Sequence, residues 1–530
     1  MQSTDRRSTR RVRTTGNLRA AVSCVPVTFA DRVHRSPDAL ALDDGTRTRT
    51  WGELDLRVRR LARFLREELG IPAGGHAATL THNRVECIEL MHAAIHAGIW
   101  LTPINWHLLE PEIAHVVQDS SAAVVFADGA HAEIARAAGA KRVLELGDSL
   151  DRAVAAASDA PMDSSGRSGG PMIYTSGTTG RPKGVRRARP ARLDAALENF
   201  RAGARAVGLD GSGPHLVTGP IYHSAPGMFA VYDQMNGAPL VILPRWSERE
   251  ALRALATREI EHTHLVPTMF VRLLRLPEEE RTAFRAPRLH LVLHGAAPIS
   301  PAIKRQMIEW WGPVLVEYWG GTESGVITCI GSKEWLAHPE TVGRALPGYE
   351  VFAADDDGRR LPPGEIGMLY ARHARIEKMF EYHEDPAKTA SSYLDASAFT
   401  LGDIGRVDAE GYVALADRSA HTIISGGVNI YPAEIEGVFQ QHPAVSDVAC
   451  FGVPDDEWGE QVKAAVELAP GVAPSPALAE ELLAFARARL AGYKVPRSID
   501  FEDALPRHPS GKLYVRRLRD RYWQGRERKI

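Results

Sequence analysis

The feature that most constrains the fold is the alternation of two sequence patterns through the first two thirds of the chain. Short apolar runs, such as residues 77–81 and 240–243, have the length and composition of buried strands. The longer stretches between them, such as residues 85–97 and 301–311, space their apolar side chains as the buried face of a helix requires. This alternation predicts layered α/β units built on mainly parallel sheets.

The pattern changes twice towards the C-terminus. Residues 347–372 are rich in Gly, Pro and short apolar runs, which predicts a small antiparallel β subdomain. From residue 417 onwards, strand and helix patterns predict a compact α+β unit. We therefore predict an N-terminal arm at residues 1–26, a large domain of layered α/β subdomains plus the β subdomain at 27–416, and a small C-terminal α+β domain at 417–530.

Composition excludes several classes of protein. The net charge of −2 offers no basic excess for binding nucleic acid. The 4 cysteines are isolated and the histidines do not cluster along the chain, so neither a disulfide framework nor a structural zinc site is predicted, and a reducing cytoplasm fits. No apolar run approaches the ~20 residues of a membrane span, although a peripheral membrane contact and a homodimer stay open.

The first 26 residues are rich in arginine and contain a single acid, Asp5. No apolar segment follows them, which excludes a secretory signal peptide. We predict a disordered basic arm, with a transit peptide and a misplaced start codon as the alternatives.

Residues 172–185 carry the strongest chemical signal in the chain. The hydroxyl, glycine and lysine residues of this segment are Thr175, Ser176, Gly177, Thr178, Thr179, Gly180 and Lys183. Glycines let backbone N–H groups approach a phosphate, hydroxyls donate hydrogen bonds, and lysine supplies positive charge. The segment is not a Walker A loop, because Pro182 precedes the lysine and Gly184 follows it. A phosphate-binding loop of another kind is predicted.

This segment resembles the phosphate-loop signature of the adenylate-forming (ANL) superfamily, which includes acyl- and aryl-CoA synthetases, nonribosomal adenylation domains and firefly luciferase. Further motifs similar to those of the superfamily follow in the same order at residues 318–324, 401–403, 417–436 and 506–512. Residues 266–272 and 308–313 look most like fatty-acid CoA ligases of the actinobacterial type. The resemblance implies a large AMP-binding domain, a mobile C-terminal domain and ATP-dependent activation of a carboxylic acid.

The resemblance assigns most nucleotide contacts to the large domain. Trp319 stands where the superfamily usually has tyrosine, and its flat indole would stack on adenine. Thr322 would hydrogen-bond the α-phosphate, Glu323 would hold Mg²⁺, and Asp403 would accept both ribose hydroxyls. Arg418 would help to fix the ribose or the phosphate. The other nucleotide-binding residues implied are Gly295, Ala296, Ala297, Tyr318 and Gly320.

Two segments of the C-terminal domain are implied to act in turn. Lys512 would bridge the carboxylate substrate, the α-phosphate and the ribose during adenylation, and it is grouped with Lys183, Thr322 and Glu323 as catalytic. Ser425, Gly426 and Gly427 would let the pantetheine arm of coenzyme A approach the backbone. The chain departs from the superfamily at Ala420, where Asp or Lys is usual at the domain hinge.

The acyl site is implied by residues 220–227. His223, Gly320 and Gly321 would border the acid, and this segment offers no aspartate to pair with the ammonium of an amino acid. The apolar residues nearby, Met228, Phe229, Pro267, Met269 and Phe270, suggest an apolar pocket or simply core. We therefore expect a fatty acid of medium to long chain as the substrate and coenzyme A as the acceptor.

Alternatives of the same and of another class stay open. A steroid or bile-acid side chain or an aryl acid would suit the same chemistry, and so would an acyl-AMP ligase that loads a carrier protein. A non-catalytic binding homologue is the alternative of a different class.

Overall fold

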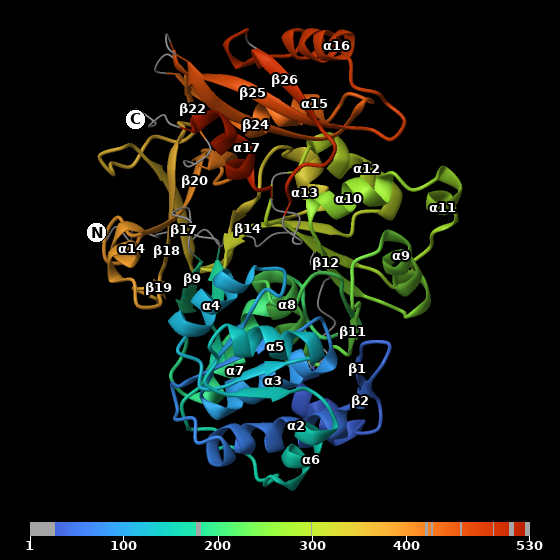
Figure 1. Ribbon diagram of the computed structural model, residues 1–530, viewed down its shortest axis with the longest axis vertical. Helices are drawn as coiled ribbons and strands as arrows, with labels where there is room; N and C mark the ends of the chain where they lie inside the picture. Colours follow the sequence, from blue (N-terminus) through green and yellow to red (C-terminus); the bar gives the residue numbers. More distant parts are fainter. Residues whose placement is uncertain are drawn as a thin grey trace, which may run out of the picture.

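A nine-stranded sheet runs through the large domain (Figure 1). From β1 to β14 its neighbouring strands are parallel, whereas β2, β15 and β16 are antiparallel to the strand beside them. Its strands, in spatial order, are β16 (Arg344–Ala345), β15 (Gly325–Gly331), β14 (Leu315–Gly321), β13 (Leu291–His294), β12 (His262–Leu265), β10 (His215–Val217), β11 (Leu240–Ile242), β1 (Leu40–Asp43) and β2 (Thr48–Thr50).

A second sheet is parallel throughout. Its strands, in spatial order, are β6 (Val143–Glu145), β5 (Val125–Ala127), β3 (His76–Leu80), β4 (Trp100–Pro103) and β7 (Gly170–Pro171). The two sheets confirm the predicted layered α/β architecture, because parallel strands need helical crossovers that cover their faces.

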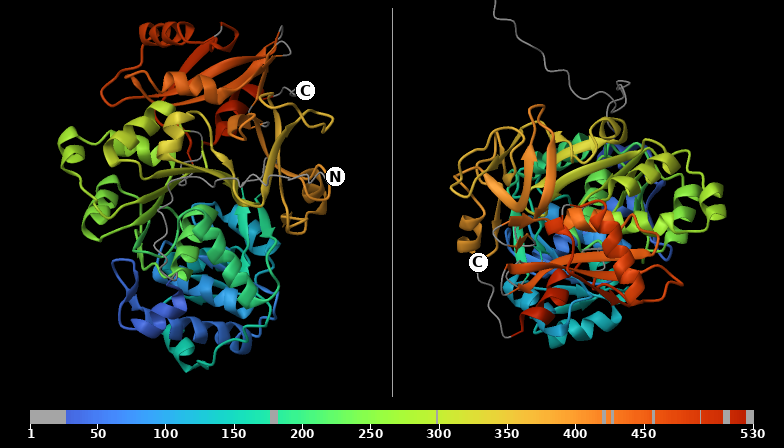
Figure 2. Two further views of the ribbon diagram at one scale, coloured as in Figure 1. Left: turned by 180° about the vertical axis from the view of Figure 1, so that it is seen from behind. Right: turned by 90° about the horizontal axis from the view of Figure 1, so that it is seen from above.

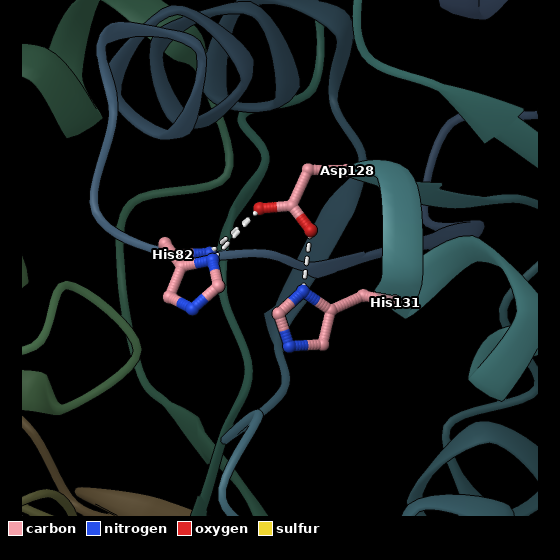
Figure 3. A group of neighbouring side chains, drawn as sticks. All are labelled: His82, Asp128 and His131. Atoms are coloured by element: carbon pink, nitrogen blue, oxygen red, sulfur yellow. Dashed lines mark hydrogen bonds and ion pairs between the residues drawn. The ribbon is translucent and has the colours of Figure 1, made fainter.

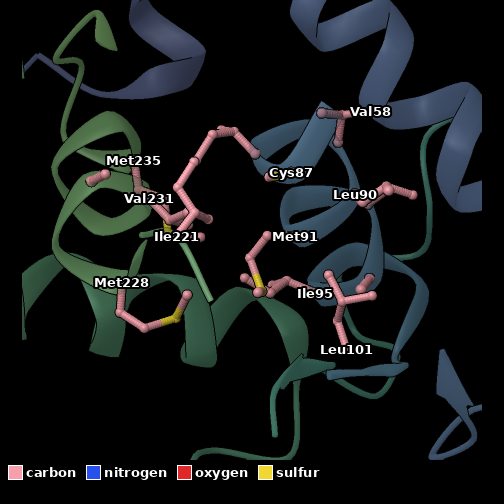
Figure 4. Close-up of a cluster of buried hydrophobic side chains, with 14 of the residues drawn as sticks. Val58, Cys87, Leu90, Met91, Ile95, Leu101, Ile221, Met228, Val231 and Met235 are labelled. Carbon is pink, nitrogen blue, oxygen red and sulfur yellow. The ribbon is translucent and has the colours of Figure 1, made fainter. Parts of the chain in front are cut away.

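Helices α3 (Val85–Ala97) and α8 (Ser224–Met235) lie between these two sheets, α3 against β4 and β7, and α8 against β10 and β12. Figure 4 shows the apolar side chains, among them Met91 and Val231, that meet between them. Because α3 is covered on almost every side, nearly all its residues are buried. The remaining helices of the large domain are α1 (Phe29–Arg35), α2 (Trp51–Arg63) with a π-helical turn (Phe64–Glu68), α4 (Glu110–Asp119), α5 (Gly129–Ala137), α6 (Asp148–Ala156), α7 (Leu193–Ala206), α9 (Glu248–Thr257), α10 (Pro267–Leu274), α11 (Glu278–Ala283), α12 (Pro301–Trp311), α13 (Ser332–Ala337) and α14 (Pro386–Ser391).

Two antiparallel sheets flank the carboxyl end of β14. One contains β19 (Phe380–Tyr382), β9 (Lys183–Arg187) and β8 (Ile173–Thr175). The other contains β17 (Tyr349–Ala354), β18 (Gly367–His373), β20 (Phe399–Val407) and β21 (Val413–Arg418). The second sheet includes the predicted β subdomain. Because β21 still pairs with β20 at Arg418, we propose that the large domain ends there, two residues beyond the predicted boundary at 416.

The C-terminal domain lies above the large domain in Figure 1, and Figure 2 shows it from above. Its sheet contains β23 (Val428–Ile430), β22 (Ile423–Ser425), β25 (Gly459–Leu468), β24 (Val445–Asp455) and β26 (Ser498–Glu502). Its helices are α15 (Pro432–Phe439), α16 (Pro476–Arg487), a 3₁₀ turn (Gly492–Lys494) and α17 (Val515–Trp523). It has its own hydrophobic core around Ile435, Phe439 and Leu482.

The computed structural model describes residues 27–175, 182–297, 299–418, 422–425, 428–455, 458–490, 492–507 and 513–524. The predicted arm at 1–26 and the unusual hinge residue Ala420 lie outside these ranges. Among the helices described, none is both long enough and apolar enough to cross a membrane.

Candidate active site

The predicted nucleotide-binding residues 295–297 and the motif at residues 318–324 lie at the carboxyl ends of β13 and β14. These strands are parallel, with His294 opposite Glu317, so the segments that follow them emerge side by side. Gly295 lies so close to Tyr318 that a Cβ at residue 295 would be 2.7 Å from the Tyr318 carbonyl oxygen. The next residue, Ala296, has a φ of 66°, a left-handed conformation that is costly for a non-glycine residue. Strained backbone of this kind is often kept at a ligand site.

Trp319 and Asp403 belong to different motifs but contact each other directly. The Trp319 indole donates a hydrogen bond of 2.8 Å from Nε1 to Oδ2 of Asp403, and both side chains are buried. Asp403 lies on β20 directly opposite Arg418 of β21. The structure therefore brings three predicted residues to one place, although only the backbone of Arg418 is described. The predicted stacking of Trp319 on adenine stays a prediction.

Glu323 is held by a residue that sequence reasoning missed. It lies with Thr322 in the half-buried turn between β14 and β15, and the Tyr382 hydroxyl donates to its Oε1 at 2.9 Å. Tyr382 ends β19, which pairs with β9 in register with Val185. Pairing of these distant strands brings Tyr382 to the site, and no local sequence signal marks this residue.

Lys183 forms an ion pair with Asp385, its Nζ lying 2.7 Å from Oδ2. The hydrogen bond from Lys183 lowers the pKa of the Asp385 carboxyl below its usual value. Asp385 also caps α14 by accepting from the Lys388 backbone N–H. The only sequence signal at Asp385 was that of a helix cap before Pro386. Thr175 lies opposite Lys183 in the β8–β9 pair, whereas Ser176, Gly177, Thr178, Thr179 and Gly180 lie outside the described residues.

Strand β14 has no room for a side chain at Gly320. A Cβ there would lie 2.0 Å from the Gly325 carbonyl oxygen of the neighbouring strand. Gly321 is less confined, but a Cβ would still lie 3.0 Å from the Glu323 carboxylate. Gly320 therefore lets β14 and β15 pass close to each other, and Gly321 leaves room for the Glu323 carboxylate.

His223 immediately precedes α8, and its ring lies 4.5 Å from the ring of Tyr222 between centroids. The Asn83 side chain holds this segment, since it donates to Gly219 O at 2.9 Å and accepts from Ile221 N at 2.9 Å. A cavity of about 10 Å³, roughly enough for one water molecule, lies beside Asn83 and Tyr222.

Of the apolar residues expected near the acyl group, four are buried and one is only half-buried. Phe229 is half-buried, meets Tyr318 edge-on with centroids 5.3 Å apart, and lies 5.5 Å from His264. The buried residues are Met228, Pro267, Met269 and Phe270. Phe229 is therefore the better candidate for contact with an acyl group.

The C-terminal domain reaches the large domain beside Tyr222. Burial raises the pKa of Tyr222, and the neighbouring Tyr514 of the C-terminal domain raises it further. Lys512, Gly426 and Gly427 lie outside the described residues, whereas Ser425 ends β22. Arg507 and Leu513 form a β-bridge, and Tyr514 N donates to Pro506 O at 2.8 Å. The two ends of the segment that carries Lys512 are thus tied together near Tyr222.

Comparison with known proteins agrees with this geometry. The family described as "AMP-binding enzyme" matches residues 29–380, and the family described as "AMP-binding enzyme C-terminal domain" matches residues 434–512. The fatty acid–[acyl-carrier-protein] ligase ScoC of Streptomyces coeruleorubidus is 32% identical over 91% of this chain and 93% of its own. A feruloyl-CoA synthase of an Amycolatopsis species is 33% identical over 93% of this chain and 97% of its own.

Two solved structures of one protein, MatB from Rhodopseudomonas palustris, match to different degrees. The ATP-bound structure gives a TM-score of 0.80 at 28% identity, covering 94% of this chain and 99% of that chain. The apo structure gives 0.70 at the same identity and coverage. Because sequence and coverage are equal, the difference lies in conformation, and this chain is closer to the ATP-bound form.

Proposed function

The chain belongs to the AMP-binding enzymes of the adenylate-forming superfamily, and we propose that it is an acyl-CoA synthetase for fatty acids of medium to long chain. It is an AMP-forming acid–thiol ligase. Two observations on and beside β14 support the finer proposal. Trp319 and Tyr382 donate hydrogen bonds to Asp403 and Glu323, and the half-buried Phe229 meets Tyr318 of the same strand edge-on.

In the first half-reaction, a carboxylate oxygen of the acid attacks the α-phosphorus of ATP, and the bond to the pyrophosphate oxygen breaks. The products are an acyl-adenylate and pyrophosphate. We propose that Thr322, Lys183, the Thr175 loop and Lys512 stabilise the negative charge on the phosphate oxygens. The protein contributes mainly by positioning the reactants and by preorganised charge.

Glu323 fits a ligand of Mg²⁺, which would neutralise phosphate charge when bound. Its carboxylate is half-buried, and the Tyr382 hydroxyl fixes one of its oxygens. Asp385 would release Lys183 to a phosphate at little cost, because their ion pair is partly exposed.

In the second half-reaction, the thiol of coenzyme A attacks the acyl carbonyl carbon, and AMP leaves with the bonding electron pair. The thiol proton passes to solvent or to the leaving phosphate. We propose that Ser425, Gly426 and Gly427 border the pantetheine arm once the C-terminal domain has rotated and withdrawn Lys512.

The choice of a fatty acid follows from charge and apolarity at residues 220–229. Tyr222, His223 and Ser224 supply no anion there, and an unpaired buried ammonium would cost several kcal/mol. Fatty acid and ferulate appear in the names of the two relatives above, so an aryl acid is the alternative substrate. A carrier protein is the alternative acceptor, favoured by the name of the first relative.

A panel of acids tests this proposal. Pyrophosphate release should be faster with octanoate or palmitate than with ferulate, a cholanoic acid or any standard amino acid. Addition of coenzyme A should increase the rate of AMP release. Faster release with an amino acid would exclude the proposed substrate class. No ATP–pyrophosphate exchange with any acid would favour a non-catalytic homologue.

A cytoplasmic location remains part of the proposal. It rests on the isolation of the cysteines, since no disulfide joins those that the structure describes.

A further inference from the structure

Asp210, His262 and His290 form a cluster at the amino ends of β12 and β13 in the nine-stranded sheet. The candidate active site lies at the other end of the sheet's strands. His262 begins β12, and His290 immediately precedes β13. The segments of the candidate site follow the opposite, carboxyl ends of β13 and β14. A strand of this length separates its ends by roughly 10 Å, so the cluster is distinct from the site where ATP is proposed to bind.

The two imidazole rings point their Nε2 atoms at each other, 3.1 Å apart. His262 is fully buried, and its Nδ1 lies 2.7 Å from Oδ2 of Asp233. His290 Nδ1 lies 3.3 Å from the backbone carbonyl oxygen of Arg288. Carboxylate and carbonyl oxygens accept hydrogen bonds, so these contacts assign the ring proton of each neutral histidine to Nδ1. Both Nε2 atoms then present lone pairs to one another, an arrangement that a cation between them would stabilise.

Further oxygen atoms surround the same point. Oδ1 of Asp210 lies 3.6 Å from His262 Nε2, and the Ser212 hydroxyl oxygen lies 3.2 Å from it. The candidate ligand atoms of Asp210, His262 and His290 all lie within 4.8 Å of one another. Ligands at the usual Zn–N and Zn–O distances in a tetrahedron are about 3.3 Å apart, and the separations of His262 Nε2 from His290 Nε2 (3.1 Å) and from Asp210 Oδ1 (3.6 Å) are close to this value.

We propose that Asp210, His262 and His290 bind a divalent transition metal ion of the zinc class. Two imidazole nitrogens and a carboxylate are ligands typical of zinc, whereas Mg²⁺ prefers oxygen ligands alone. Asp233 would act as the carboxylate that orients a metal-binding histidine, and Arg288 O would do so for His290. Because the Asp210 side chain is 55% exposed and that of His290 is 34% exposed, an ion can reach the site from solvent.

A second histidine cluster shows what this arrangement adds. In the group of His82, Asp128 and His131, both Nδ1 atoms are directed at the Asp128 carboxylate itself (Figure 3). The Thr81 hydroxyl also donates to that carboxylate, at 2.7 Å. Hydrogen bonds within the group therefore satisfy Asp128, and no outer carboxylate is seen to orient either ring among the contacts described. His82 supplies a matched control for the test.

Zinc titration of the untagged, chelator-treated protein in excess Mg²⁺ tests the proposal. Calorimetry should give one zinc ion per chain, and Co²⁺ in its place should give the visible absorption of a tetrahedral site. Both Asp210→Asn, at an exposed position, and His290→Gln should weaken zinc binding at least tenfold, whereas His82→Gln should leave it unchanged.

Thermal unfolding provides an independent readout, because an ion that binds only the folded protein raises the midpoint. Zinc should raise the midpoint of the wild type and of His82→Gln, but not that of Asp210→Asn. The proposal would be overturned if zinc did not bind at one ion per chain, or if wild type, Asp210→Asn and His290→Gln bound it equally. The contact between the two Nε2 atoms would then be explained by a proton shared between His262 and His290.

Discussion

The large and the C-terminal domains present their predicted site residues in different ways. In the large domain, four of these side chains already have a partner, in three contacts. Trp319 donates to Asp403, Tyr382 donates to Glu323, and Lys183 pairs with Asp385, at 2.8, 2.9 and 2.7 Å. Such contacts hold the side chains in place before any ligand arrives.

The C-terminal domain contacts the large domain at separate points on its surface. One contact is a hydrogen bond from Arg275, at the end of α10, to the backbone carbonyl oxygen of Ser446. Tyr514 of the C-terminal domain also interacts electrostatically with Tyr222 of the large domain. Because we propose that the C-terminal domain rotates between the half-reactions while the large domain stays prearranged, changes in the large domain should affect both half-reactions. Changes in the C-terminal domain should affect one.

The largest effect is expected from Lys512→Ala. Loss of one preorganised cation should slow adenylation by roughly 10²–10³, while thioester formation from presynthesised acyl-adenylate should change much less. Pyrophosphate release and single-turnover acyl transfer measure the two steps. Equal slowing of both in a folded variant would show that the domains do not divide the reaction.

Gly427→Leu should have the opposite selectivity. A bulky side chain where the pantetheine arm is proposed to pass should slow acyl transfer to coenzyme A by about 10², and pyrophosphate release should be spared. Gly427→Ala is the smaller matched change, and its rate of acyl transfer should lie between those of the wild type and Gly427→Leu. If pyrophosphate release fell as much as acyl transfer, residues 426–427 would not serve coenzyme A alone.

Asp403→Ala should impair both half-reactions, because the ribose is held throughout. Loss of charge-assisted hydrogen bonds should weaken nucleotide binding by about 1.5–3 kcal/mol. Asp403→Asn keeps an acceptor for Trp319 and so separates loss of charge from loss of this support. An unchanged KM for ATP with full kcat in Asp403→Ala would remove this residue from the site.

The smallest effect is expected from Tyr382→Phe, which removes the hydroxyl that orients Glu323. Loss of an orienting contact should raise the Mg²⁺ concentration for half-maximal activity about tenfold. At saturating Mg²⁺ the rate should recover, which distinguishes orientation of the metal ligand from general damage. A lower rate at every Mg²⁺ concentration with unchanged half-saturation would contradict the role of Tyr382.

Helices, strands and motifs could be predicted because their signals, hydrophobic periodicity and motif order, are local properties of the sequence. The helices at Val85–Ala97 and Pro301–Trp311 have the predicted bounds. The motifs also indicated the superfamily and the type of reaction. What each motif residue touches depends on strand pairing, which no local pattern records.

The sequence by itself determined the layered architecture, which follows from spacing along the chain, and the family and candidate residues, which follow from the resemblance of its motifs. Tertiary structure alone decided that Trp319 supports Asp403 across 84 positions, and that Tyr382 supports Glu323 across 59. It also brought together His262 and His290, which no histidine cluster in the sequence indicated. The physical reason is that side-chain contacts of this kind depend on the order and register of distant strands, which only the packed sheets fix.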